Sequence, residues 1–348
     1  MSLKDATAYN IQFENGKPIF IDTTSFEKYT EGQPWIAYKQ FCQHFLAPLA
    51  LMSYTDIRLS QLLKTYIDGI PLDLASSLLP TKTKFSFSFL SHIHLHSKAQ
   101  KKYEKSGDGK DKKSHVSLNG LIGIIDNLKS TINGLKWAPD NTEWADYYND
   151  TNYTDEAFNN KRDLVTQFFN SVPNASMVWD LGANTGEFSR IASQKGVKTI
   201  AFDIDPSAVE KNYLTIIEND ENNLLPLELN LCNPSPGIGW ANTERRSIKD
   251  RGPADVIFAL ALVHHLAISN NVPLEKIAQY LSTLCSYLII EFIPKEDSKV
   301  QYLLSSREDI FTDYHKSGFE AAFSKYFSII KQSPVLESHR TLYLMNKK

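Results

Sequence analysis

The sequence predicts an α/β protein with a mostly parallel sheet of seven strands, preceded by a mainly helical domain that contains a β-hairpin. From about residue 155, short apolar runs rich in β-branched residues alternate with helical patterns, which is typical of a parallel sheet covered by helices on both faces. Before that point, apolar residues recur mostly at helical spacing. A chain of 348 residues exceeds what a single core usually supports, so we expect two domains, 1–150 and 151–348.

The composition is that of an ordinary globular protein, with 42% hydrophobic and 22% charged residues. A net charge of −3 leaves no electrostatic footprint for nucleic acid or an anionic membrane. No apolar run is long enough for a membrane span, and the polar start lacks the apolar core of a signal peptide. Cys42, Cys232 and Cys285 fit no disulfide framework, so we expect reduced thiols and a cytoplasmic location.

The first domain begins with a hairpin over residues 9–22, because Asn15-Gly16 suits a type I′ turn in which both residues need a positive φ. Helical spacing follows over 35–54, where Pro48 is expected to bend or break the helix. Further amphipathic helices are expected over 56–68 and about 118–133.

Two segments of the first domain leave alternatives open. Residues 98–113 contain seven lysines and three acids, so they form either a basic arm for phosphate or RNA or, as the acids favour, a solvated surface loop. A run of aromatic residues could form a lid over a site or pack between domains; it comprises Trp137, Trp144, Tyr147, Tyr148 and Tyr153.

The second domain is expected to begin with a helix over 155–170. The strands are expected at 177–181, 198–203, 225–231, 254–260, 287–293, 326–331 and 341–346. The intervening helices are expected at about 187–195, 206–217, 273–285 and 306–323. Only a short polar segment joins the last two strands, which predicts an antiparallel hairpin at an edge of the sheet.

A glycine-containing turn follows the first of these strands, in the segment Asp180-Leu181-Gly182-Ala183-Asn184-Thr185-Gly186. Gly182 and Gly186 permit a tight turn and a close approach of backbone to ligand, and Asn184 tolerates a left-handed conformation. The spacing differs from the glycine patterns of dinucleotide and nucleoside-triphosphate sites, which weakens both of those interpretations.

Asp203 ends the second strand, 23 residues after Asp180. A carboxylate at this position can accept hydrogen bonds from both ribose hydroxyls of an adenosine ligand. Ile204 would then lie against a flat base.

In these residues the sequence resembles the class I S-adenosylmethionine-dependent methyltransferases, over about residues 155–348. The resemblance implies a Rossmann-like sheet of seven strands with an antiparallel last strand, and S-adenosyl-L-methionine as cofactor. It also implies that Asp180 lies under the methionine amino group, that Gly182, Ala183, Asn184 and Gly186 surround the methionine portion, and that Asp203 binds the ribose. Asn230 occupies the place of the residue that contacts the adenine, where an Asp is more usual.

The whole chain is also similar to a narrower group of predicted methyltransferases that is sometimes labelled nodulation-related. The shared phrases lie at residues 10–13, 20–22, 35–49, 233–236, 239–240, 259–266 and 291–297. This resemblance identifies no substrate.

The acceptor side is expected after the fourth strand, because ligands of open α/β sheets bind beyond the carboxyl ends of the strands. His264 and His265 follow that strand, and a histidine there could take a proton from an acceptor hydroxyl. The alternative is that both are structural; of the two, we expect His265 to be the base. Glu291 ends the fifth strand and points either to the ligand or into an ion pair with Arg307 or Lys295.

The segment His92-x-His94-x-His96 has the spacing of a metal site, either on one face of a strand or, for His92 and His96, on a helix. No carboxylate or cysteine lies nearby to complete it, so we expect no metal.

The sequence thus predicts methyl transfer to a small-molecule acceptor, in particular a hydroxyl, with the first domain shaping the acceptor pocket. Two alternatives remain at this point. One is a non-catalytic S-adenosylmethionine-binding or scaffold protein, and the other is a methyltransferase that acts on RNA or protein.

Overall fold

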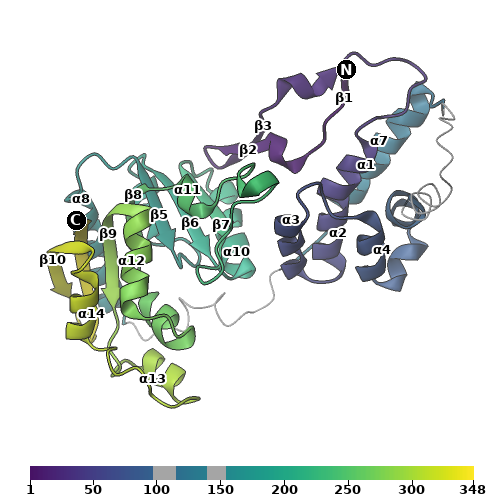
Figure 1. Ribbon diagram of the computed structural model, residues 1–348. Helices are drawn as coiled ribbons and strands as arrows, with labels where there is room; N and C mark the ends of the chain where they lie inside the picture. Colours follow the sequence, from purple (N-terminus) through teal and green to yellow (C-terminus); the bar gives the residue numbers. More distant parts are fainter. Residues whose placement is uncertain (97–114, 139–153) are drawn as a thin grey trace. The chain divides into compact units, whose positions relative to one another are not determined.

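The structure is a computed structural model, and it describes residues 1–96, 115–138 and 154–348 (Figure 1). The lysine-rich segment, the predicted boundary at residue 150 and the aromatic run beyond Trp137 lie outside the described residues. The chain divides into two compact units, Met1–Ala138 and Pro139–Lys348. In the described ranges, no helix combines the length and the apolar character needed to cross a membrane.

The first unit opens with two small antiparallel sheets. In one, β1 (Ser2–Leu3) pairs with β4 (Phe26–Glu27); in the other, β2 (Ile11–Glu14) pairs with β3 (Lys17–Phe20). Asn15 and Gly16 have φ values of 51° and 74°, as the predicted type I′ turn requires. Short 3₁₀ turns, η1 (Ala8–Asn10) and η2 (Thr23–Ser25), flank the hairpin.

The rest of this unit is helical and surrounds its own apolar core. The segment 35–54 forms α1 (Tyr38–Phe41), the π-helical turn η3 (Cys42–Leu46) and α2 (Ala47–Tyr54). The irregular turn therefore comes directly before Pro48, where the helix was expected to bend or break. The helix expected over 56–68 is shorter, with a 3₁₀ turn η4 (Ile57–Gln61) followed by α3 (Leu62–Thr65). The remaining elements are α4 (Leu72–Leu78), η5 (Thr81–Phe85), α5 (Phe87–Phe89), the π-helical η6 (Leu90–Leu95) and α7 (Leu118–Asn133).

The second unit contains the seven-stranded sheet that the sequence predicts, in the order β10-β11-β9-β8-β5-β6-β7. Its strands are β5 (Met177–Leu181), β6 (Lys198–Asp203), β7 (Leu224–Glu228), β8 (Ala254–Ala259), β9 (Cys285–Phe292), β10 (Phe327–Pro334) and β11 (Thr341–Lys347). Strand β11 is antiparallel to both of its neighbours, whereas β5 to β9 pair in parallel. The predicted antiparallel last strand is confirmed.

Helices connect these strands (Figure 1). They are α8 (Asp155–Asn170), α9 (Ser189–Ser193), α10 (Pro206–Glu218), α11 (Ile248–Arg251), α12 (Leu274–Leu284), α13 (Ser298–Leu304) and α14 (Lys316–Phe323). Two short turns complete the unit, the 3₁₀ turn η7 (Trp240–Asn242) and the π-helical turn η8 (His265–Ser269).

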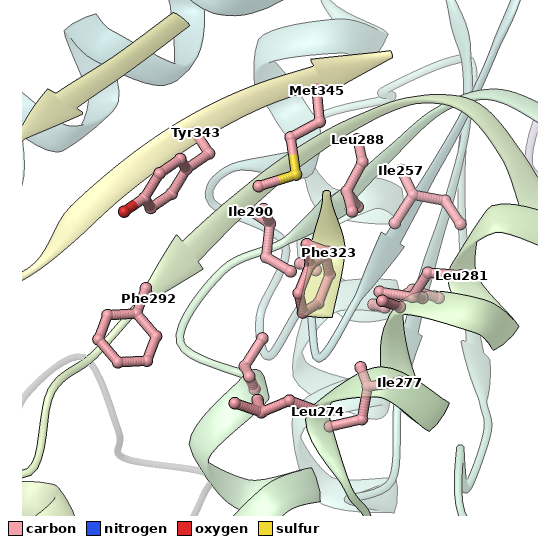
Figure 2. Close-up of a cluster of buried hydrophobic side chains, with 14 of the residues drawn as sticks. Ile257, Leu274, Ile277, Leu281, Leu288, Ile290, Phe292, Phe323, Tyr343 and Met345 are labelled. Atoms are coloured by element: carbon pink, nitrogen blue, oxygen red, sulfur yellow. The ribbon is translucent and has the colours of Figure 1, made fainter. Parts of the chain in front are cut away.

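Both faces of the sheet are covered because its strands are apolar on both sides. In β8, Val256 and Phe258 face a core that includes α8 and α9, while Ile257 and Ala259 face a core that includes α12 and α14. Figure 2 shows the second of these cores, where strand residues such as Leu288 and Ile290 approach helix residues of α12. Full burial of a side chain of this size stabilises the fold by about 1.5–3 kcal/mol.

One predicted helix is wrong in extent. The segment 306–323 was expected to be one helix, but within it only α14 is helical, and α13 ends before the segment begins. Between them, Tyr314 is buried and donates a hydrogen bond to the Ile293 carbonyl, at 2.7 Å, so this stretch packs as an irregular segment. The side chain of His315 then accepts from the amide of Gly318 and begins a new helix.

Candidate functional site

The turn between β5 and α9 adopts the conformation that its residues predict. Gly182, Asn184 and Gly186 all have positive φ values, of 74°, 50° and 82°. The amides of Gly182 and Ala183 both donate to the Phe202 carbonyl, at 2.8 and 2.9 Å. These bonds hold the turn beside the end of β6, so it lies at the carboxyl edge of the sheet.

Asp203, the last residue of β6, is bonded to this turn. One carboxylate oxygen accepts from the Asn184 amide at 2.7 Å, and the other accepts from the Asp205 amide at 2.9 Å. Burial raises the pKa of Asp203, and hydrogen bonds from the backbone amides of Asp205, Asn184 and Ile204 oppose that effect. The turn and the acid are thus connected directly by a hydrogen bond.

A cavity of about 270 Å³ opens at this edge, close to the lower end of the ~300–1,000 Å³ range of ligand pockets. Its lining comes from α8 and from the segments that follow β5, β6, β7 and β8. The predicted residues that line it are Asp180, Gly182, Ala183, Asn184, Asp203, Ile204, Asn230 and His265. The other lining residues are mostly apolar and include Phe158, Phe188, Leu229, Leu260, Leu262 and Leu266.

Gly186 lies behind the lining and is needed for packing. A Cβ built on it would lie 2.5 Å from the side-chain nitrogen of Asn212, a residue of α10 that is fully buried. Because real Cβ atoms do not approach other heavy atoms so closely, any side chain at position 186 would force the buried Asn212 side chain to move.

Asp180 lines the cavity and is only 2% exposed. Ser189 donates a hydrogen bond to its carboxylate at 2.6 Å. Burial nevertheless raises the pKa of Asp180 to about 7, because the ionised form loses its hydration. This acid therefore titrates near neutral pH.

Ile204 and Asn230 lie on the loops that follow β6 and β7. The Ile204 side chain is 55% exposed, so an apolar surface faces outward directly beside Asp203. The Asn230 side-chain oxygen accepts from the Cys232 amide at 2.8 Å. An outward apolar side chain next to a carboxylate suits a flat base attached to a sugar.

Glu291 is completely buried and does not line the cavity. Its ion-pair partners differ from those expected: Lys161 of α8 lies at 2.7 Å and Arg340 at 3.9 Å. The same carboxylate accepts from the amide of Ala261 at 2.8 Å. Arg307 and Lys295 bond elsewhere, to the Ile268 carbonyl and to Asp309.

The two adjacent histidines have different surroundings. His265 lines the cavity, whereas His264 is buried, with 1% of its surface exposed. The centroids of the two imidazole rings lie 4.0 Å apart. Burial lowers the pKa of His265 to about 4 and places that of His264 well below its usual value. Both rings are therefore neutral at pH 7, and only His265 is placed to touch a ligand.

Two of the three histidines in the segment 92–96, His92 and His94, are held by hydrogen bonds to side chains of the first unit. The strand alternative is wrong, since His92 and His94 lie in the π-helical η6. His92 contacts the Tyr38 hydroxyl at 2.6 Å and Asn127 at 2.9 Å, and His94 contacts Ser76 and Thr83. Within the described ranges, no three His, Cys, Asp or Glu side chains are grouped to hold a metal ion.

Sequence reasoning missed Lys161, which lines the cavity with 3% of its surface exposed. A signal was present: Lys161 lies on the apolar stripe of its helix, between Phe158 and Val165 at spacings of three and four. A lysine at such a position needs a buried partner, and Glu291 is that partner.

The strand order, the antiparallel β11 and a glycine turn bonded to an acid at the end of β6 define the fold of class I methyltransferases. No protein-family model matches the chain. It is 37% identical over 350 residues to nodulation protein NoeA of Rhizobium meliloti (strain 1021), and the match covers 99% of this chain and 73% of that protein. The chain belongs to the family of nodulation protein NoeA.

Solved structures with a similar fold include methyltransferases. The match to WbdD, a bifunctional kinase-methyltransferase, has 18% identity and a TM-score of 0.39, and it covers 54% of this chain and 40% of WbdD. The match to magnesium protoporphyrin IX methyltransferase ChlM from Synechocystis PCC 6803, with bound SAH, has 17% identity and a TM-score of 0.40. It covers 55% of this chain and 84% of ChlM. The match to the 16S rRNA methylase ArmA has 17% identity and a TM-score of 0.37, and it covers 56% of this chain and 85% of ArmA. At such identities and scores, the likenesses support no conclusion about what this chain acts on.

We predict that Gly186→Ala destabilises the protein more than Gly196→Ala. Both glycines have φ values near 80°, but a Cβ at Gly196 meets nothing within 4 Å. The left-handed backbone costs about 1–2 kcal/mol in each variant, and the clash with Asn212 should add about 1–3 kcal/mol in Gly186→Ala alone. Urea denaturation measures the difference, and equal losses would contradict the packing role of Gly186.

We also predict that Lys161→Met lowers the free energy of unfolding by about 3–5 kcal/mol, because the Glu291 carboxylate stays buried without its nearest cation. The double variant Lys161→Met/Glu291→Gln should recover most of this loss, since neither charge remains. Lys295→Met, which breaks the exposed pair with Asp309, is the control and should cost less than about 1 kcal/mol. A Lys161→Met variant as stable as this control in urea would show that the buried pair is unimportant.

Proposed function

We propose that the protein is an S-adenosyl-L-methionine-dependent methyltransferase that acts on a small molecule, in particular on a hydroxyl group. One observation carries this proposal: the cavity at the carboxyl edge of the sheet is lined together by Asp180, the glycine turn and Asp203. In the proposed complex, Asp203 accepts from the ribose hydroxyls, Ile204 lies against the adenine with Asn230 near its edge, and Asp180 takes the methionine ammonium.

When bound, S-adenosyl-L-methionine supplies a methyl group on a positively charged sulfur; its carbon–sulfur bond breaks with both electrons on sulfur while the acceptor oxygen bonds the carbon and gives up its proton. The protein's task is then to orient the two partners and to receive that proton. We propose His265 as the base, since it lines the cavity and is neutral at pH 7. His264 and Glu291, both buried, act as positioning residues for the loop that bears His265.

A small-molecule acceptor is favoured because the cavity lining is mostly apolar and the chain as a whole has no cationic excess. A cytoplasmic location, proposed with it, agrees with three cysteines that are all free. The role of the first domain in shaping the acceptor site stays a prediction.

The test of the proposed function has two stages. Calorimetry with S-adenosylmethionine and S-adenosylhomocysteine measures binding, and release of S-adenosylhomocysteine in the presence of hydroxyl compounds, RNA or protein measures turnover. Binding followed by turnover with a hydroxyl compound supports the proposal. Absence of binding refutes the proposal. Turnover with RNA or protein would show that the acceptor is a macromolecule and not a small hydroxyl compound. Binding without turnover on any of the three acceptor classes favours a non-catalytic role.

We expect the affinity for S-adenosylhomocysteine to fall as the pH is lowered from 7 to 5, by up to about tenfold per unit. Asp180 must be ionised to hold an ammonium group, and with a pKa of about 7 it is increasingly protonated in this range. Calorimetry in buffers of different ionisation enthalpy should therefore show a proton released on binding. Asp180→Asn should bind weakly at every pH.

Ser189→Ala provides the matched control for this pH dependence. The Ser189 hydroxyl stabilises the ionised form of Asp180, so its loss should raise the pKa of Asp180. The pH at which the affinity for S-adenosylhomocysteine begins to fall should therefore be higher in this variant. A wild-type affinity that does not change between pH 5 and 7 would contradict the assignment of Asp180 to the ammonium.

We expect His265→Ala to slow methyl transfer by about 10²–10⁴-fold while the affinity for S-adenosylhomocysteine stays unchanged. Since the pKa of His265 is about 4, the rate of the wild-type protein should show no inflection from this residue between pH 5 and 8. Single-turnover measurements across this pH range check both expectations. Full turnover in His265→Ala would exclude this side chain as the base.

A further inference from the structure

A charged lysine forms part of the cavity wall without exposure to bulk water. Lys161 projects from α8, is 3% exposed and lines the cavity together with Asp180. Its Nζ atom lies 2.7 Å from the Glu291 carboxylate and 4.8 Å from the centre of the Phe188 ring. Two contacts thus place the ammonium group on the wall, one with Glu291 of β9 and one with Phe188, the residue directly before α9.

The charges around Lys161 balance before any ligand binds. Arg340 lies 3.9 Å from Glu291 and donates to Asp297 at 2.7 Å, so two cations and two carboxylates form one buried network. An ammonium taken out of water costs several kcal/mol unless it is paired in good geometry. Glu291, which does not itself line the cavity, supplies that pairing, and it opposes the effect of burial, which lowers the pKa of Lys161.

Asp180 places a carboxyl group in the lining of the same cavity. Lys161 is close enough to Asp180 for their charges to interact, and the neighbouring lining residues Phe158 and Phe188 are apolar. A carboxylate and an ammonium in one apolar cavity are complementary to a ligand group that bears both charges. The ammonium of such a ligand would meet the carboxylate of the protein, and the carboxylate of the ligand would meet the ammonium. The α-amino-acid zwitterion has that chemistry.

We propose that Lys161 binds the α-carboxylate of the ligand while Asp180 binds its α-ammonium, so that the cavity selects ligands that end in an intact amino acid. This inference rests on the proposed function, because it takes the methionine end of S-adenosylmethionine as that amino acid. Lys161 thereby determines specificity for the cofactor, and Glu291 is the residue that positions it.

The test compares two ligands that differ only in the carboxylate: S-adenosylhomocysteine and its decarboxylated counterpart, 5′-S-(3-aminopropyl)-5′-thioadenosine. The wild-type chain should bind S-adenosylhomocysteine about 10- to 100-fold more tightly in calorimetry, the effect of one charge-assisted hydrogen bond. Lys161→Met should bind both with similar affinity. Lys295→Met, which changes a partly exposed lysine that does not line the cavity, should keep the wild-type ratio.

The ratio of the two affinities separates recognition from stability, since a merely structural role of Lys161 would weaken both ligands equally. The double variant Lys161→Met/Glu291→Gln repeats the comparison in a chain without the unpaired buried acid, and it should also show no preference. A preference that survives in either variant, or its absence from the wild-type chain, overturns the inference. Failure of the wild-type chain to bind S-adenosylhomocysteine at all would instead overturn the proposed function.

Discussion

The buried carboxylate of Glu291 is the constraint around which the cavity is organised. A carboxylate without solvent exposure must be compensated, and Glu291 draws Lys161 from α8, the amide of Ala261 after β8, and Arg340 before β11. Ala261 has a φ of 49°, a conformation that costs a non-glycine residue about 1–2 kcal/mol. The hydrogen bond from the Ala261 amide to the Glu291 carboxylate offsets this cost. The chain turns at Ala261, and Leu262 and His265, which follow it, line the cavity. Glu291 thus shapes a site that it does not touch.

Asp203 has a complementary role on the other side of the cavity. Its carboxylate accepts hydrogen bonds from backbone amides on both loops, including those of Asn184 and Asp205, so it joins the loops after β5 and β6. A carboxylate offers about four acceptor positions, which leaves capacity for ligand hydroxyls. Because the acid is already oriented by the backbone, a ligand that bonds to it does not have to order it first. The same residue is therefore a structural link and the proposed ribose contact.

The parts of the fold that follow from local pattern were predictable, and those that depend on distant pairing were not. The helix Asp155–Asn170 and the strand Met177–Leu181 were expected with the bounds found, since periodicity alone determines them. The turn conformation at Asn184 also follows from residue type. The pair between Lys161 and Glu291 spans 130 residues, and no local pattern relates two residues so far apart. The helix expected over 306–323 failed because burial of Tyr314 overrides helical spacing.

The low pKa of His265 is compatible with the proposed role when the order of events is considered. With a pKa of about 4, the neutral ring is a poor base toward an intact hydroxyl. Once the oxygen has begun to bond to the methyl carbon, however, its proton becomes strongly acidic, and even a weak base then accepts it. A base with this pKa is unprotonated over the whole physiological pH range, so it can accept a proton whenever cofactor and acceptor are both bound.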